Sequence, residues 1–297
     1  ASLALGARVP PTELADARAS LGTGENLYSP ALDGGAPVTF EFCGKPEGTF
    51  TPNYYPEPAC NTASTNAGDY DLSVGGGGIN KGFQQSLKLE GENGYQKLHK
   101  LLLAAAEKSP GILAAPESGS EAERLARSLG LQACFARLPT YAKGPVSAIF
   151  LDILAPEHRP LSERNVAMLY VVGPRGSPGG TDPTIARSGS FLRAVHDLGA
   201  NAVSAVSEYN GFIRKRPGLP RIDTVQWCLV SGGAYRHPET TKEDVAAATV
   251  RGMLQAGRQL RSQPGGAEAM PTVRFAYDNA VFEAAVERLA GSGGGPR

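Results

Sequence analysis

Apolar residues form three near-continuous runs in the second half of the chain, and each run predicts a buried β-strand. The runs cover residues 146–154, 166–172 and 222–230. Unbroken apolar segments of this kind are typical of central strands that have helices on both faces of the sheet. Two shorter segments, 38–43 and 272–277, predict two further strands.

Between these runs, apolar residues recur every three or four positions, as they do along one face of a helix. Ser120, with Glu123 three residues later, also has the spacing of a capping box at a helix start. The segments that predict helices are 79–87, 95–105, 120–130, 191–206, 240–260 and 278–289.

Strands that alternate with helices predict an α/β fold, a three-layer α/β/α sandwich with a mixed central sheet and ligands at the loops beyond the strand ends. We expect residues 37–290 to form this one domain. Residues 1–36, rich in Pro and Gly, are expected to be an N-terminal extension, and residues 291–297 a flexible tail. Residues 48–71 predict a long polar loop, and loops of that length in a compact domain are often functional.

The charge balance bears on the choice of partner. Lys plus Arg and Asp plus Glu each number 29, so no overall field attracts a nucleic acid or an anionic membrane. We therefore expect that the chain binds neither nucleic acid nor a membrane and that it is a monomer. Any anion-binding site is expected to be local. The four cysteines lack CxxC spacing, which argues against zinc; we expect no metal and no cofactor.

The chain has no apolar run of about 18 residues and no signal-peptide pattern at its N-terminus. We accordingly expect a cytoplasmic protein, or one delivered to a host cytosol if it is a secreted effector.

A run of four glycines, 75–78, separates a short apolar-polar segment from the helix predicted over 79–87. Glycine can adopt positive φ and lets a ligand lie directly on the backbone. The helix behind it offers free N–H groups and the positive end of its dipole, so a phosphate is the expected occupant. A second turn of the same kind, Ser231-Gly232-Gly233, follows the strand predicted at 222–230.

Two glycine loops suit a ligand with two phosphates, because each supplies backbone donors to one side of a diphosphate. A dinucleotide-binding fingerprint fits poorly, since the four glycines do not follow the first strand and no acidic residue ends a second strand at the expected distance. A Walker motif also fails, because no Gly-Lys-Ser/Thr is present at the required spacing.

Together the two loops resemble those of macrodomains, which bind ADP-ribose. Residues 75–85, Gly-Gly-Gly-Gly-Ile-Asn-Lys-Gly-Phe-Gln-Gln, are similar to the first macrodomain loop, and residues 61–66 stand where the family has an Asn-Ala-Ala-Asn segment. Residues 170–174, Tyr-Val-Val-Gly-Pro, resemble a strand ending of the family. Residues 230–246 are similar to the second loop and its helix. The resemblance covers roughly residues 60–260, in the family's order.

The resemblance implies that the diphosphate lies between the two glycine loops and that Tyr235 flanks the distal ribose or the phosphates. The residues that it places in contact with ADP-ribose are Asn66, Gly75, Gly76, Gly77, Gly78, Ile79, Ser231, Gly232, Gly233, Ala234 and Tyr235. The glycine loop also resembles that of poly(ADP-ribose) glycohydrolases, but Gln84-Gln85-Ser86 stands where those enzymes have Gln-Glu-Glu.

Hydrolysis at the anomeric carbon needs a nearby carboxylate. Asn80 occupies the place where many hydrolytic macrodomains have Asp, and Gln85 the place of a glycohydrolase acid. Any catalytic acid must therefore come from elsewhere, and Asp69 and Asp71, just before the glycines, are the candidates. The catalytic set predicted on this basis is Asp69, Asp71, Asn80 and Gln85.

The resemblance implies a hydrolase that removes ADP-ribose from protein side chains, and among larger macrodomains it is similar to the bacterial effector type that reverses arginine-linked modification of ubiquitin. The alternative is a reader that binds ADP-ribose or an ADP-ribosylated protein and cleaves nothing, which the missing family acids favour. A third class, a nucleotide-sugar transferase or phosphatase-like enzyme, would show a metal or an acid pair near Gly75.

Overall fold

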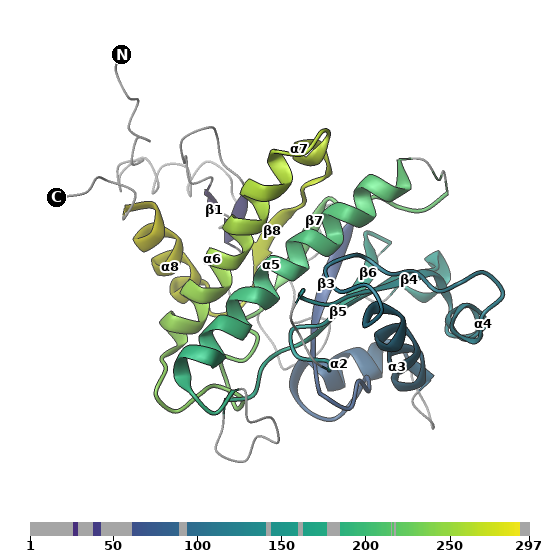
Figure 1. Cartoon of the computed structure of the whole chain (residues 1–297), viewed down its shortest axis with the longest axis horizontal. Helices are drawn as coiled ribbons and strands as arrows, with labels where there is room; N and C mark the ends of the chain where they lie inside the picture. The colour runs from purple at the N-terminus through teal and green to yellow at the C-terminus, as the bar shows by residue number, and fades with distance from the viewer. Residues whose placement is uncertain are drawn as a thin grey trace.

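The computed structural model describes residues 26–28, 38–42, 61–88, 94–140, 144–159, 163–176, 185–214, 216 and 218–291. Its described strands form one eight-stranded sheet in the order β1-β2-β8-β7-β3-β6-β5-β4 (Figure 1). The strands are β1 Asn26–Tyr28, β2 Phe40–Phe42, β3 Thr62–Gly68, β4 Leu131–Arg137, β5 Ile149–Leu154, β6 Asn165–Val172, β7 Thr224–Trp227 and β8 Thr272–Phe275.

The sheet is mixed. Neighbours among β2, β8, β7, β3 and β6 run parallel, whereas β1 with β2, β5 with β6 and β4 with β5 are antiparallel pairs. The carboxyl ends of β3, β6 and β7 therefore meet at one edge of the sheet, where ligands bind in open α/β sheets.

Helices cover both faces. On β4 and β5, side chains alternate between the faces: Asp152 meets His99 of α3, and Phe135 packs against Tyr209 of α5. α2 lies on the same face of the sheet as α3. Its Asn80 forms a hydrogen bond with Asn66 of β3, and Asn66 is paired with Tyr170 of β6, whose ring contacts His99 of α3. The helices are α2 Gly78–Ser86, α3 Gly94–Ala106, α4 Glu121–Ser128, α5 Ser188–Ile213, α6 Lys242–Arg261, α7 Gly266–Ala269 and α8 Asn279–Gly291, with a 3₁₀ turn η2 at Pro156–His158.

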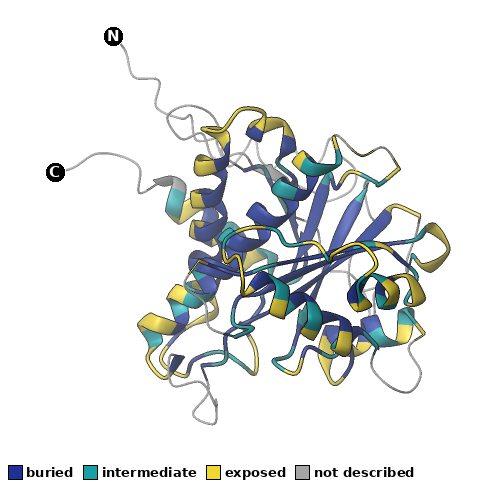
Figure 2. Ribbon diagram, turned by 45° about the vertical axis from the view of Figure 1, so that its right-hand side comes forward, coloured by how far each residue is buried: buried dark blue, intermediate teal, exposed yellow. Residues whose placement is uncertain are grey.

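α4 packs beside α3, whereas α6 packs on α5 and α8 on α6 (Figure 1). The three-layer α/β/α sandwich with a mixed sheet is therefore confirmed. The strands themselves are buried almost throughout, and the exposed residues lie on the outer sides of the helices and on the loops (Figure 2).

One expectation was wrong: the end of the predicted polar loop 48–71 is a central strand, β3. Its residues are small and polar, so the hydrophobic pattern gave no strand signal. The neighbouring strands supply the partners that such residues need in a core. Ser64 Oγ lies 2.8 Å from Asn165 Oδ1 on β6 and 3.2 Å from Gln226 Oε1 on β7.

The proposed domain boundaries stay predictions, because most of the N-terminal extension and residues 292–297 lie outside the described part of the chain. Within that extension, β1 pairs with β2. Cys134 and Cys228 are buried, and Cys43 and Cys60 lie outside the described residues. None of the described helices is long and apolar enough to cross a bilayer.

Candidate functional site

Three segments meet where β3, β6 and β7 end. Asp69 follows β3, Arg175 follows β6, and Tyr235 lies in the loop after β7. The Arg175 guanidinium forms an ion pair with Asp69 and donates to Tyr235 Oη at 3.1 Å. Tyr235 Oη in turn lies 3.3 Å from the other Asp69 carboxylate oxygen. Each of these three side chains thus contacts the other two, at the carboxyl ends of the parallel strands.

Two aromatic rings hold the Arg175 guanidinium in this position. Its central carbon lies 4.4 Å from the centre of the Tyr235 ring and 5.1 Å from that of Tyr70, within the range of cation–π attraction. Arg175 Nε is buried and has no hydrogen-bond partner among the described residues. The Arg175 cluster (Asp69, Tyr70, Arg175 and Tyr235) thus ties the first loop region to the second.

Tyr170 supports the first loop from the sheet. Its hydroxyl accepts from the Asp69 backbone N–H at 2.9 Å and lies 3.0 Å from the Ser73 carbonyl, to which it can donate. Burial raises the pKa of Tyr170 above its usual range, so the hydroxyl stays protonated and keeps its donor. Gly68 has to lack a side chain, because a Cβ there would overlap the Tyr170 ring.

His99 of α3 holds the next part of this loop. Its Nδ1 lies 3.1 Å from the Leu72 carbonyl, and its Nε2 lies 2.9 Å from Asp152. Both side chains are fully buried. A carbonyl oxygen only accepts, so a hydrogen bond to Leu72 requires the proton on Nδ1. Leu72, whose φ is 66°, is kept in this uncommon conformation by that bond and by its buried side chain.

The predicted transition from glycine loop to helix is confirmed. Gly75, Gly76 and Gly78 have φ values of 152°, 90° and 57°, which side chains disfavour. Gly77 is the N-cap of α2 and provides no side-chain cap. The N–H groups of Gly78, Ile79 and Asn80, in the first turn of α2, therefore have no partner within the helix. Above Gly76, Gly77 and Gly78 the space that a Cβ would enter is open.

Asn66 of β3 and Asn80 in the first turn of α2 contact each other. Asn66 Nδ2 donates to Asn80 Oδ1 at 3.0 Å, and Asn80 Nδ2 donates to the Ser73 carbonyl at 3.0 Å. Both residues are buried. Asn66 Oδ1 has no partner among the described residues, so this carbonyl oxygen is an acceptor that lacks a donor.

The second glycine loop packs against the segment after β6. Ser231 has a φ of 61° and donates from Oγ to the Pro174 carbonyl at 2.8 Å. Gly176 donates its backbone N–H to the Tyr235 carbonyl at 2.8 Å. Ser231 and Gly232 are buried, whereas Gly233 and Ala234 are exposed.

The acids that were predicted to be catalytic have other partners. Asp69 is engaged by Arg175 and Tyr235, and the Asp71 carboxylate accepts from the backbone and the hydroxyl of Ser73, each at 2.9 Å. Gln85 is exposed on α2, and Asn80 bonds as described above. No described group of three His, Cys, Asp or Glu residues could hold a metal ion. The catalytic roles stay predictions.

Sequence reasoning missed Arg175, Tyr70 and Tyr170. The Gly-Pro after β6 marks the end of a strand at the edge of the sheet where ligands bind. The arginine that directly follows it could therefore have been predicted as a site residue. Nothing in the sequence pairs Arg175 with Asp69, which is 106 positions away.

Several curated proteins are similar to this chain. DNA/RNA-binding protein ALBA4 of Plasmodium yoelii yoelii is 32% identical over 257 residues, which make up 84% of this chain and 65% of that protein. ALBA4 of Plasmodium falciparum is 30% identical over 244 residues, 79% of this chain and 62% of the relative. The chain thus spans a little less than two thirds of the length of these two relatives. Mitochondrial association factor 1 form a1 of Toxoplasma gondii is 32% identical over 217 residues, 67% of this chain and 47% of that protein.

Solved structures that are similar include macrodomains. One from Oceanobacillus iheyensis with MES bound has a TM-score of 0.46 at 12% identity and covers 90% of this chain and 98% of its own. One from Trypanosoma brucei in complex with ADP-ribose has a TM-score of 0.37 at 13% identity, over 96% and 93% of the two chains. Likeness at this level carries no argument about the site.

The model of the Mitochondrial association factor 1 C-terminal domain family matches residues 31–258. This match includes β3, β6 and β7 and all three segments that form the Arg175 cluster. The chain belongs to the family of Mitochondrial association factor 1 C-terminal domains.

Proposed function

We propose that this chain binds ADP-ribose at the start of α2, with the diphosphate against the glycine loop and a ribose near Asn66. The observation that carries the proposal is the buried Asn66–Asn80 pair at the uncapped N-terminus of α2. The N–H groups at that terminus and its dipole favour a phosphate. Asn66 Oδ1, a buried acceptor without a donor, suits a ribose hydroxyl.

Of the two possible roles, we propose a reader rather than a hydrolase. Cleavage at the anomeric carbon needs a carboxylate that is free to activate water or to protonate the leaving group. The two candidate carboxylates near the loop are both engaged, Asp69 by Arg175 and Asp71 by Ser73. Asn80 cannot replace an acid in this step.

The binding test uses Gly77→Asp, followed by calorimetry with ADP-ribose. Gly77 is an N-cap in extended conformation with open space around it, so aspartate fits there and caps the helix. We expect unchanged or slightly higher thermal stability, together with at least about tenfold weaker binding, because the carboxylate occupies and repels the phosphate site. Gly211→Asp, at another glycine with open space, is the control and should bind as the wild type does. Equal binding by wild type and Gly77→Asp would place the ligand elsewhere.

The reader role is tested by incubation with proteins mono-ADP-ribosylated on arginine, serine or carboxylates. We expect binding without release of ADP-ribose. Release from any one linkage, lost in Asp69→Asn or Asp71→Asn, would restore the hydrolase hypothesis and identify its acid. A cytosolic location and a monomeric state remain proposals as well. We also propose that the chain has no nucleic-acid partner, although two relatives carry the name DNA/RNA-binding protein. Titration with an oligothymidylate, described below, tests this proposal.

A further inference from the structure

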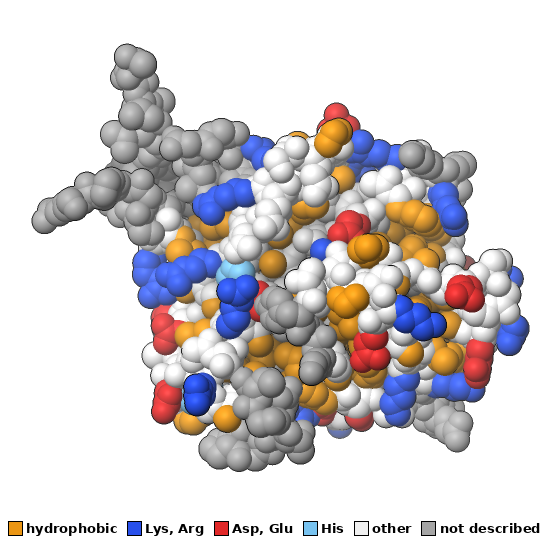
Figure 3. Space-filling model, viewed as in Figure 1, with side chains coloured by type: hydrophobic (Ala, Val, Ile, Leu, Met, Phe, Trp, Pro, Cys, Tyr) orange, Lys and Arg blue, Asp and Glu red, His pale blue; other side chains and the backbone are white. Residues whose placement is uncertain are grey.

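A polar hollow lies on the layer formed by α5, α6 and α8, where α5 and α6 begin. Its volume is about 470 Å³, within the range of small-ligand pockets. Figure 3 shows basic side chains beside a histidine on this face. Each of the three helices contributes one arginine to the hollow: Arg193, Arg251 and Arg288.

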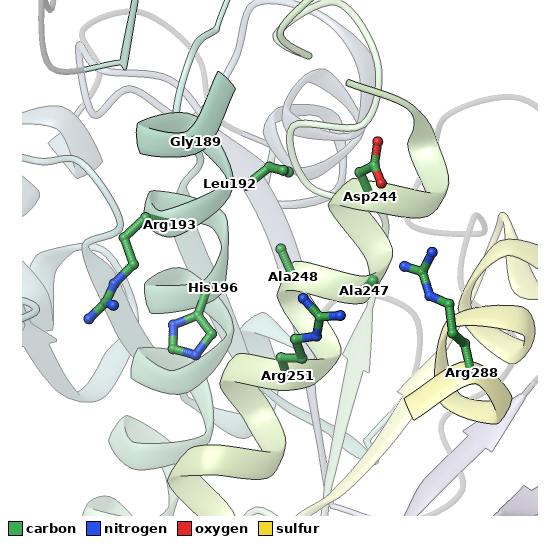
Figure 4. A pocket seen from close by; sticks show the side chains of 9 residues that line it. All are labelled: Gly189, Leu192, Arg193, His196, Asp244, Ala247, Ala248, Arg251 and Arg288. Atoms are coloured by element: carbon green, nitrogen blue, oxygen red, sulfur yellow. The ribbon is translucent and has the colours of Figure 1, made fainter. Parts of the chain in front are cut away.

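Apart from His196, the uncharged part of the lining consists of Leu192 and three small residues. Ala247 and Ala248 of α6 leave room between the arginines, and Gly189 does so at the start of α5 (Figure 4). The guanidinium groups of Arg251 and Arg288 face the same space below Asp244, while His196 lies between α5 and α6 (Figure 4). Arginine forks match phosphate oxygens in two parallel hydrogen bonds.

Little negative charge balances these arginines. Asp244 is the one acid that lines the hollow, and its Oδ2 already accepts from the backbone and hydroxyl of Thr241 in the capping box of α6. Asp197 pairs with Arg193 at 3.2 Å and with His196 at 2.9 Å. No described carboxylate forms an ion pair with Arg251 or Arg288, both of which are exposed.

His196 lies beside these arginines in the lining of the hollow. Burial lowers the pKa of His196, and the nearby charges of Arg193 and Arg251 lower it further, against a hydrogen bond with Gln255 that raises it. His196 is thus neutral near pH 7 and can serve as one more hydrogen-bonding group at the rim.

We propose that this hollow is a second binding site, which holds the phosphate group of a soluble phosphorylated ligand between Arg251 and Arg288, with His196 at its α5 side. The lining contains no Phe, Tyr or Trp, the side chains that usually form the stacking platforms for single-stranded nucleic acid. This absence favours a small phosphorylated ligand over single-stranded nucleic acid.

The test is calorimetric titration of the full chain with pyrophosphate at constant ionic strength. The charge-removing variant is Arg251→Gln with Arg288→Gln, and the control is Arg258→Gln with Arg261→Gln, two exposed arginines of α6 outside the hollow. All four side chains are exposed, so we expect every variant to fold. The proteins are compared in a Gly77→Asp background, which removes the phosphate site proposed at the glycine loop. We expect saturable binding by Gly77→Asp alone and with the control substitutions, and at least about tenfold weaker binding when the hollow substitutions are added.

Equal weakening by both pairs of substitutions, or no saturable binding by Gly77→Asp alone, would overturn the proposal. If the wild type binds pyrophosphate and Gly77→Asp does not, the ligand lies at the glycine loop. A twelve-residue oligothymidylate is titrated in parallel. If it binds through the arginines while pyrophosphate does not, the hollow is a nucleic-acid surface instead.

Discussion

At the scale of single residues, the ion pair between Asp69 and Arg175 decides what the strand-end site can do. The pair neutralises the one acid closest to the meeting point of the three strands and joins the segments after β3 and β6. The side chains are 36% and 30% exposed, so solvent screens the charges and the pair stabilises the fold only modestly. The ion pair matters because it holds the segments after β3 and β6 together, rather than because of its contribution to the free energy of unfolding.

A double-mutant cycle with Asp69→Asn and Arg175→Gln measures this pair. We expect each single variant to lower the free energy of unfolding and the double variant to lose less than the sum, with a coupling of about 1 kcal/mol. Urea denaturation of the four proteins supplies the values. Additive effects would mean that the two side chains do not interact in solution. Glu208→Gln, which removes the ion pair with Arg137 elsewhere, serves as a reference variant.

At the scale of elements, two glycines allow α5 and α6 to approach each other closely. A Cβ on Gly199 would overlap the Thr249 carbonyl, and one on Gly252 would overlap the His196 carbonyl. This contact fixes the relative position of the helices that carry Arg193 and Arg251, and so it shapes the hollow between them.

Gly252→Ala tests this contact. The added methyl meets backbone that cannot move aside easily, so we expect a loss of about 1–3 kcal/mol of stability, or more, despite the higher helix propensity of alanine. Gly211→Ala in α5, where the added atom enters open space, should be neutral or stabilising. Thermal denaturation compares the two. A Gly252→Ala protein as stable as Gly211→Ala would show that the helices are not in contact through this glycine.

The elements also show what hydrophobic patterning can and cannot predict. Apolar runs located β5, β6, β7 and β8, because burial on both faces of the sheet selects such residues. β3 was not predicted because its buried residues include Thr, Ser and Asn, whose hydrogen-bond partners lie on strands that are far away in the sequence. β4 was not predicted either: its exposed and half-buried positions, Gln132, Ala133 and Arg137, interrupt the apolar pattern.

At the scale of the whole molecule, the balance of 29 basic and 29 acidic residues hides a local imbalance. The glycine loops could be found from the sequence because each is a contiguous motif at a strand end. The arginines of the hollow come from three separate helices, and Asp69 and Arg175 from two distant strand ends, so only the folded chain brings these groups together.

The pH dependence of stability is also a property of the whole molecule, and Asp197 gives it a testable sign. Burial raises the pKa of Asp197 from its ordinary 3.8 to about 6. A carboxyl whose pKa is raised on folding contributes stability that is fully present below its unfolded pKa and is lost as the pH rises through the folded pKa. The groups that face it are Arg193 and His196 of α5, with Arg251 and Gln255 of α6 beyond them.

Asp197→Asn should therefore gain in Tm relative to its parent as the pH rises from 4 to 7.5. The comparison is made in a His196→Gln background, since lowering of the pKa of His196 contributes stability of the opposite sign, present above pH 6.5 and lost on acidification. Scanning calorimetry at four pH values supplies the difference. A difference that is constant with pH would mean that Asp197 titrates alike in the folded and unfolded chain. A difference that falls as the pH rises would mean that the pair with Arg193 outweighs burial and holds the carboxylate in its charged form.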